Sequence, residues 1–280
     1  MGQFLSRRGF LGGTGAAAAT VALSAKSYAR VIGANDRIGV GFIGVGGMGT
    51  SHLRSFNSIK EADNLLAAGV CDCWKTRAEE GAALIGTEAC TDYRQLLDAK
   101  DVDYVTVAVP EHSHAPITLD ALDAGKAVYC EKPLTHAIDE AQAVVKKQKE
   151  TGLAVQVGVQ STSDDSYSSA AEAIEGGVLG QVVQAQIDYV RRYGEQGPWR
   201  NPDISDDTPM PSDLDWSTWL GSAPKIDWDP HHYFEWRNYK AYSGGVATDL
   251  FIHRITRILK ACNLLYPRRV VGMGGIWQWP

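Results

Sequence analysis

Residues 37–49 constrain the fold of this chain more than any other segment. The first part, 37–44, is almost continuously apolar, which is typical of a strand buried on both faces of a parallel sheet. Gly-Val-Gly-Gly-Met-Gly occupies 44–49, and residues 50–56 have a helical pattern. A strand, a glycine-rich turn and a helix in this order predict the phosphate-binding unit of a doubly wound α/β domain.

The glycines of this turn have separate physical roles. Gly44 permits the tight turn, Gly46 lets the backbone approach a pyrophosphate, and Gly49 lets the helix pack close to the strand. A lone G-x-G-x-x-G motif is a weak signal in a chain with 29 glycines, so its place between a strand and a helix carries the prediction. The predicted cofactor-binding loop comprises Gly44, Val45, Gly46, Gly47, Met48 and Gly49.

A second apolar strand, 65–71, ends at an acidic residue. Asp72 lies 23 residues after Gly49, near the offset at which an acid binds ribose hydroxyls. Its charge would repel a 2′-phosphate, which favours NAD over NADP, although Lys75 and Arg77 weaken this preference. Asp72 could also cap the helix that begins near Trp74, and the two roles are compatible.

Strands and helices continue to alternate up to residue 160. Apolar runs at 101–109, 127–130 and 153–159 predict strands, with helices over 115–124 and 138–151. This alternation predicts a doubly wound parallel sheet, in which ligands bind beyond the carboxyl ends of the strands. Further residues at or beside those ends, predicted to contact the cofactor, are Pro110, His114, Glu131, Lys132 and Gln160.

Three motifs give the chain a specific resemblance. They are Gly-Phe-Ile-Gly-Val-Gly-Gly-Met-Gly at 41–49, Val-Pro-Glu-His-Ser-His-Ala-Pro at 109–116 and Ala-Gly-Lys-Ala-Val-Tyr-Cys-Glu-Lys-Pro-Leu at 124–134. From about residue 35 onward, the chain resembles the glucose–fructose oxidoreductase/inositol dehydrogenase (Gfo/Idh/MocA) family. The resemblance implies an NAD(P)-binding Rossmann domain over 35–160 and a substrate and oligomerisation α+β domain over 161–280.

The same resemblance implies three catalytic residues. Lys132 matches the family lysine that contacts cofactor and substrate hydroxyl, and Asp249 and His253 match its Asp-x-x-x-His helix. A partly desolvated lysine beside a nicotinamide would have a lowered pKa and could polarise a sugar hydroxyl. We expect His253 to accept the hydroxyl proton and Asp249 to orient the site. A surface lysine and an ordinary helix pair are the simpler alternatives.

The second half is predicted to contain an open, mostly antiparallel sheet. Residues 182–190 alternate in polarity and 267–279 do so loosely, which predicts strands, and 246–261 has a helical pattern. Family members usually continue further, so we expect this domain to be C-terminally incomplete. Four tryptophans in the long loop over 194–235 and one directly after it either stack on sugar rings or pack the loop: Trp199, Trp216, Trp219, Trp228 and Trp236.

The first 29 residues resemble a twin-arginine export signal. Arg7 and Arg8 precede Phe-Leu, an apolar run extends over 11–23, and Ser-Tyr-Ala at 27–29 is a small-x-small cleavage site. We expect the folded protein to be exported by the Tat machinery to the periplasm or the extracellular space. No later apolar stretch is long enough to span a bilayer, so no membrane anchor is predicted.

Charge and cysteine content restrict the remaining functions. The net charge is −6, and it becomes −9 without residues 1–29, which is a poor match for nucleic acid. The five cysteines show no zinc-binding spacing. We predict no metal, since a site built from the adjacent His231 and His232 with Asp249 and His253 would have poor geometry.

These observations favour an oxidoreductase that moves a hydride between a sugar or polyol carbon and NAD, with NADP possible. One alternative is an NAD-dependent glycoside hydrolase that oxidises its substrate transiently. Another is a non-catalytic binding or assembly protein with a residual cofactor fold. Family members are often dimers or tetramers, so a homo-oligomer is possible.

Overall fold

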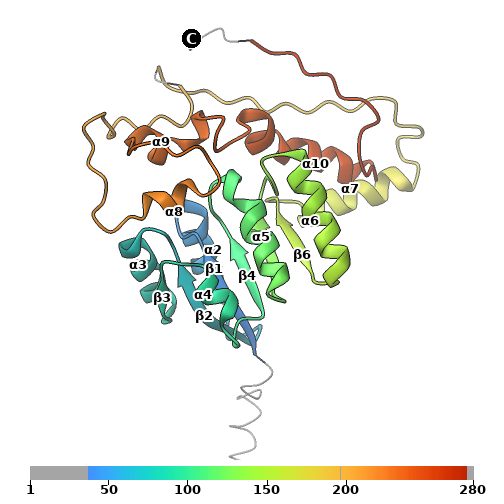
Figure 1. Ribbon diagram of the computed structural model, residues 1–280. Helices are drawn as coiled ribbons and strands as arrows, with labels where there is room; N and C mark the ends of the chain where they lie inside the picture. The colour runs from blue at the N-terminus through green and yellow to red at the C-terminus, as the bar shows by residue number, and fades with distance from the viewer. Residues whose placement is uncertain (1–36, 196, 276–280) are drawn as a thin grey trace, which may run out of the picture.

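The computed structural model describes residues 37–195 and 197–275. The first half is built on a six-stranded parallel sheet with the order β3-β2-β1-β4-β5-β6 (Figure 1). Strands β2 and β3 lie on one side of β1, and strands β4, β5 and β6 lie on the other. The order of strand addition therefore switches between β1 and β4, and such a switch point leaves a crevice for ligands at the carboxyl ends of the two strands. The strands are β1 (Ile38–Ile43), β2 (Leu65–Cys71), β3 (Ala89–Cys90), β4 (Tyr104–Val107), β5 (Ala127–Glu131) and β6 (Val155–Gly158).

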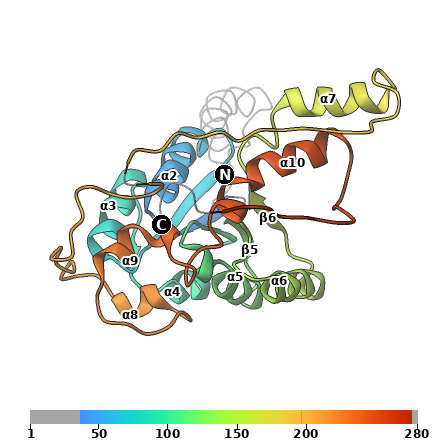
Figure 2. The same cartoon turned by 90° about the horizontal axis from the view of Figure 1, so that it is seen from above.

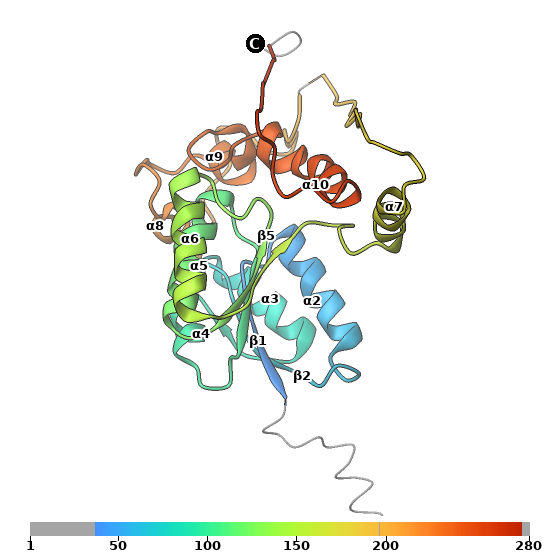
Figure 3. The same ribbon diagram turned by 90° about the vertical axis from the view of Figure 1, so that its right-hand side faces the viewer.

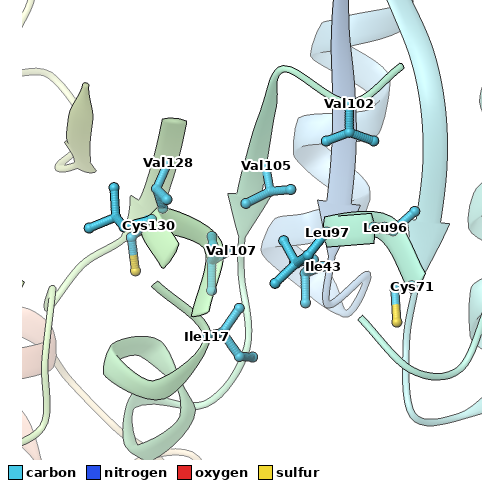
Figure 4. Close-up of a cluster of buried hydrophobic side chains, with 12 residues drawn as sticks. Ile43, Cys71, Leu96, Leu97, Val102, Val105, Val107, Ile117, Val128 and Cys130 are labelled. Carbon is cyan, nitrogen blue, oxygen red and sulfur yellow. The ribbon is translucent and has the colours of Figure 1, made fainter. Parts of the chain in front are cut away.

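Helices cover both faces of the sheet, as Figure 3 shows. On one face, Phe42 of β1 packs edge-on against Phe56 of α2, with ring centroids 5.2 Å apart. On the other face, Val105 and Val107 of β4 pack with Ile117 of α5 in the cluster of Figure 4. The first face carries α2 (Gly47–Ile59) and α3 (Lys75–Ile85), and the second carries α4 (Arg94–Asp98), α5 (His114–Asp123) and α6 (Ile138–Thr151).

The second half lies across the carboxyl ends of the strands (Figures 1 and 2). This arrangement places residues within 218–237 over the carboxyl ends of β1 and β4. The elements are α7 (Asp165–Glu175), α8 (Trp216–Leu220), α9 (Pro230–Phe234), the 3-10 helix η2 (Trp236–Asn238), the π-helix η3 (Val246–Leu250) and α10 (Ile252–Ala261).

The antiparallel sheet predicted for the second half is not confirmed. Residues 182–190 and 267–275 form no strand in the described part of the chain, and the predicted strand end at 276–279 lies outside it. Val183 and Val190 are about nine-tenths exposed. Alternating polarity does not by itself make a strand, because ladder hydrogen bonds require a neighbouring strand. No described strand pairs with either segment.

The helix predicted over 246–261 is two elements. Phe251 N–H donates to Val246 O at 3.0 Å, an i→i+5 bond that makes the first turn π-helical, and α10 begins at Ile252. Single π-helical turns are frequent at functional sites.

The described residues contain no helix with the length and hydropathy of a membrane span. The predicted signal, residues 1–29, lies outside the described part of the chain.

Candidate active site

A cavity of about 810 Å³ lies between the carboxyl ends of the strands and the second half. Its size is that of a pocket for a drug-sized ligand or cofactor. Both halves contribute to its wall, so it forms only when residues 218–237 lie over the sheet. Lining residues include Gly44, Gly46, Gly47, Met48, Asp72, Arg77, Pro110, His114, Glu131, Lys132, Trp219, Tyr233, Trp236 and Arg237.

The glycine loop leaves room for a phosphate where the sequence predicts it. Gly44 has a φ of 81°, and a Cβ there would lie 2.7 Å from Ala108 O. A Cβ on Gly49 would lie 2.0 Å from Gly44 O, so α2 packs too closely for any side chain. A Cβ on Gly46 would meet only Arg77 Nη1, at 3.7 Å. Since no side chain caps α2, its first N–H groups are available to an anion.

Asp72 lines the cavity and supports the glycine loop. Its Oδ2 accepts a hydrogen bond from Val45 N at 2.9 Å, and its Oδ1 accepts one from Trp74 N at 3.0 Å. Asp72 therefore stabilises the turn before α3 and still faces the cavity. Val45 packs into the core behind the loop.

Two cations that weaken the predicted NAD preference differ in position. The Arg77 guanidinium lines the cavity and lies over the Trp74 ring, 4.7 Å from its centroid. Lys75 pairs with Glu79 on the surface, at 3.7 Å. Only Arg77 of these two is placed to affect a cofactor.

The predicted catalytic lysine meets the predicted catalytic aspartate. Lys132 Nζ donates to Asp249 Oδ1 at 2.5 Å and to Asp249 O at 3.0 Å. Arg237 Nε donates to Asp249 Oδ2 at 3.1 Å, a contact that the sequence did not predict. The lysine and aspartate side chains are 9% and 3% exposed. Asp249 is thus fixed by two cations, one from each half.

His253 lies within electrostatic range of this pair. Burial lowers its pKa, the Lys132 charge lowers it further, and the Asp249 charge opposes both effects. His253 is therefore neutral near pH 7 and able to accept a proton. Neither Asp249 nor His253 is among the described residues that line the cavity, whereas Lys132 is.

Glu131 presents a buried carboxylate oxygen at the cavity. Its Oε1 lies 2.8 Å from His52 Nε2 of α2, and its Oε2 has no partner among the described residues. An unpaired buried carboxylate oxygen fits a hydroxyl or amide donor of a dinucleotide. Sequence analysis missed His52; its place on α2, one turn after the glycine loop, was the available signal.

His114 and Gln160 are both predicted to contact the cofactor, and of the two only His114 lines the cavity. His114 is buried, with Nδ1 2.6 Å from Pro133 O and Nε2 2.8 Å from Val109 O, so it mainly ties together the loops after β4 and β5. Burial lowers its pKa. Gln160 is exposed near Met48, with Nε2 3.9 Å from Sδ, and does not line the described cavity.

The tryptophans of the long loop mostly pack against one another. Trp216 stacks on Trp219 with centroids 4.8 Å apart, and Trp228 packs edge-on against Trp216. Trp236 lines the cavity, and Arg237 lies over its ring at 4.2 Å. Packing of the loop is thus the main role of this cluster, and Trp219 and Trp236, which both line the cavity, are the candidates for contact with a ligand.

Three of the four residues considered for a metal site, His231, His232 and Asp249, have other partners. His231 Nδ1 lies 3.1 Å from Glu235 Oε2, and His232 Nδ1 lies 2.8 Å from Tyr242 Oη. Among the residues described, no group of three side chains could hold a metal ion.

Sequence comparison assigns both halves to one family. Residues 38–159 match the profile "Oxidoreductase family, NAD-binding Rossmann fold", and residues 166–261 match "Oxidoreductase family, C-terminal alpha/beta domain". The chain therefore belongs to the Gfo/Idh/MocA family of oxidoreductases, and its first half is that family's NAD-binding domain.

Curated relatives are dehydrogenases. Inositol 2-dehydrogenase of Rubrobacter xylanophilus is 36% identical over 152 residues, covering 54% of this chain and 43% of that protein. The scyllo-inositol 2-dehydrogenase (NAD(+)) of Bacillus subtilis is 31% identical over 142 residues, covering 50% and 41%. The chain spans less than half the length of these relatives.

Solved structures confirm the fold beyond the first half. An oxidoreductase domain protein from Kribbella flavida is 24% identical, with a TM-score of 0.58 over 81% of this chain and 54% of that one. A levoglucosan dehydrogenase in complex with NADH is 22% identical, with a TM-score of 0.59 over the same shares. At this identity, the likeness shows the fold alone.

Proposed function

We propose that this chain belongs to an NAD-dependent dehydrogenase that oxidises a CH–OH group of a cyclitol or sugar. The observation that carries the proposal is the buried contact between Lys132 Nζ and Asp249 Oδ1, which joins the cavity wall to the second half. Inositol dehydrogenases among the relatives support the substrate class.

The residues have distinct roles in this proposal. Bound NAD would supply the hydride acceptor, with the glycine loop, Asp72 and Glu131 holding it. Lys132 donates a hydrogen bond to the substrate oxygen, and Asp249 keeps the ammonium in place. His253 accepts the hydroxyl proton, because its lowered pKa keeps it neutral. This role requires the substrate to reach past Lys132 toward α10.

We propose NAD as the preferred cofactor. An acid after the second strand commonly binds the ribose hydroxyls of NAD, and the Asp72 carboxylate in that role would repel the 2′-phosphate of NADP. Arg77 reduces the preference without removing it, since its guanidinium lies against Trp74.

We also propose export of the folded protein by the twin-arginine route. Its support is the sequence over 1–29, and export after folding would let the cofactor bind before the protein leaves the cytoplasm. A homo-oligomer stays a prediction.

The direct test is native purification of the full chain from cytoplasm and periplasm, with bound nucleotide identified by mass. The protein is then screened for NADH production on cyclitols and sugars. We expect bound or bindable NAD and net NADH production. Absence of NAD binding would contradict the proposal, and release of a leaving group without net NADH would indicate a transient-oxidation glycosidase, which none of the relatives above favours.

A further inference from the structure

Glu111 connects the first half to the segment that carries Asp249. It lies in the 3-10 helix η1 (Glu111–Ser113), directly after the loop that follows β4, and is 1% exposed. Its Oε1 accepts a hydrogen bond from Ser243 Oγ at 2.7 Å, and its Oε2 accepts from Gly244 N at 2.8 Å and from Thr248 Oγ1 at 3.4 Å. One buried carboxylate therefore binds three groups of a six-residue segment.

This contact fixes the start of the π-helical turn. Ser243 Oγ also accepts from Gly245 N at 3.0 Å, and Asp249 N donates to Gly245 O at 2.9 Å. The Glu111 carboxylate is thus linked to Asp249 through the Ser243 hydroxyl and the Gly245 backbone. Asp249 is in turn the partner of Lys132.

A carboxylate is an expensive group to bury at this place. Burial raises the pKa of Glu111, and the nearby Asp249 charge raises it further, while the Gly244 and Ser243 hydrogen bonds and His136 oppose the shift. A group that only filled space here would be apolar, because burying an ionisable side chain is unfavourable without a specific set of donors. All three donors belong to residues 243–248, so the bonds of the buried carboxylate hold that segment.

We propose that Glu111 is a positioning residue that holds the π-helical turn η3 so that Asp249 meets and shields Lys132. The inference concerns the site of the proposed dehydrogenase and rests on that function for its catalytic consequence. Its structural consequence, protection of the Lys132 ammonium, does not depend on any activity.

Lysine acylation mapped by mass spectrometry measures that protection directly. The unliganded full chain is treated with a limiting amount of acetic anhydride. In the wild type, Lys132 should react slowly, since it is 9% exposed and bound to Asp249. In Glu111→Ala we expect the Lys132 rate to rise by about tenfold or more, because a broken positioning contact frees the turn. Lys126, which donates to Ala99 O and Val102 O, is the internal reference and should not change.

Val144→Ala is the matched control, because Val144 is buried in α6 away from the site. It should lower the melting temperature and leave Lys132 protected. Equal acylation of Lys132 in Glu111→Ala and Val144→Ala would overturn the inference, as would a parallel rise at Lys126. Should Glu111→Ala not fold, Ser243→Ala replaces it. This variant removes the hydroxyl that donates to Glu111 Oε1 and accepts from Gly245 N, so a smaller rise at Lys132 is expected, and no rise would overturn the inference.

Activity separates this inference from the proposed function. In an active enzyme, Glu111→Ala should lower kcat by on the order of 10–100-fold, with the Kd for NADH nearly unchanged, because the glycine loop is untouched. If the wild type transfers no hydride, the proposed function is wrong. If Lys132 nevertheless loses its protection selectively in Glu111→Ala, the positioning role of Glu111 stands.

Discussion

Lys132 Nζ lies 2.5 Å from Asp249 Oδ1, although 117 residues separate them in the chain. The lysine follows β5 of the Rossmann domain, and the aspartate lies in the π-helical turn η3 of the second half. Both are buried, so loss of Asp249 leaves the Lys132 ammonium without its carboxylate, whereas loss of Lys132 leaves Asp249 paired with Arg237 alone. Any change that moves one half over the other changes this contact, and with it the site.

Lys132→Ala should abolish turnover while the chain still folds. His253→Ala should lower the rate by on the order of 10²–10⁴, the usual contribution of a general base. Steady-state rates with NAD and the substrate found by screening measure both effects. Arg254→Ala is the control, because Arg254 lies over the Tyr189 ring, 4.6 Å from its centroid, and should keep the wild-type rate. Wild-type turnover in a Lys132 or His253 variant would remove that residue from the mechanism.

Gly46→Ala should weaken NADH binding, whereas Gly49→Ala should lower the stability of the fold. A Cβ on Gly46 meets only Arg77 Nη1 at 3.7 Å, so the protein should fold with an unchanged melting temperature. The methyl group would occupy the pyrophosphate position and weaken NADH binding by about tenfold or more. Gly49→Ala places Cβ 2.0 Å from Gly44 O and should cost at least about 1–3 kcal/mol of stability. Thermal melts and NADH fluorescence titrations distinguish the two, and tight NADH binding by Gly46→Ala would refute the phosphate position.

Asp72→Ala should weaken NAD binding more than NADP binding. The substitution removes the proposed bond from the carboxylate to the ribose of NAD, whereas for NADP it would also remove the repulsion of the 2′-phosphate. Because Asp72 Oδ2 accepts from Val45 N, some loss of affinity for both cofactors is expected from a looser glycine loop. Isothermal titration with both nucleotides gives the ratio of dissociation constants. An equal loss for NAD and NADP would exclude Asp72 as the ribose-binding residue.

The pKa of His253 should respond to its charged neighbours. Burial and the Lys132 charge lower this pKa, and Arg257 contributes in the same direction. Arg257→Gln should therefore raise it toward 6.5, and Asp249→Asn should lower it further. NMR titration of the imidazole, assigned by its loss in His253→Gln, measures these shifts. In activity, the acid limb of the rate profile should lie below pH 6.5, and an unshifted pKa in Asp249→Asn would contradict the arrangement.

His112 should make the protein less stable in acid. Burial lowers its pKa from 6.5 to about 4. The unfolded chain therefore binds a proton between these values that the folded chain does not, so stability is full above pH 6.5 and is lost as the pH falls toward 4. The loss by pH 4 is about 3 kcal/mol from this group. Denaturant unfolding at several pH values should show a shallower dependence in His112→Gln, and an identical dependence would disprove the assignment.

The Rossmann half was predictable because its signals are local. A buried parallel strand must be apolar over its length, and the turn after β1 requires glycine at Gly44 for conformation and at Gly49 for close packing. Both requirements are therefore visible as a pattern in consecutive residues of the sequence. The helix ends at Gly125 and Gly152, both with positive φ, follow for the same reason.

The second half was predicted less well because its structure depends on partners distant in the chain. The alternation over 182–190 indicated a strand, but a strand needs a neighbour, and none is found in the described residues. The helix with Asp249 and His253 begins with a π-helical turn, next to contacts from Glu111 that no spacing in the sequence reveals.

By itself, the sequence determined the glycine loop, the order of strands and helices in the first half apart from β3 and α4, and the identity of the residues at the strand ends, because each depends on neighbours within a few positions. Only the tertiary structure decided that Lys132 pairs with Asp249, that Arg237 and Glu111 support that aspartate, and that His114 ties two loops together. Such contacts form when the chain brings buried charges and their donors together, and their energies depend on distance in space rather than on separation in sequence.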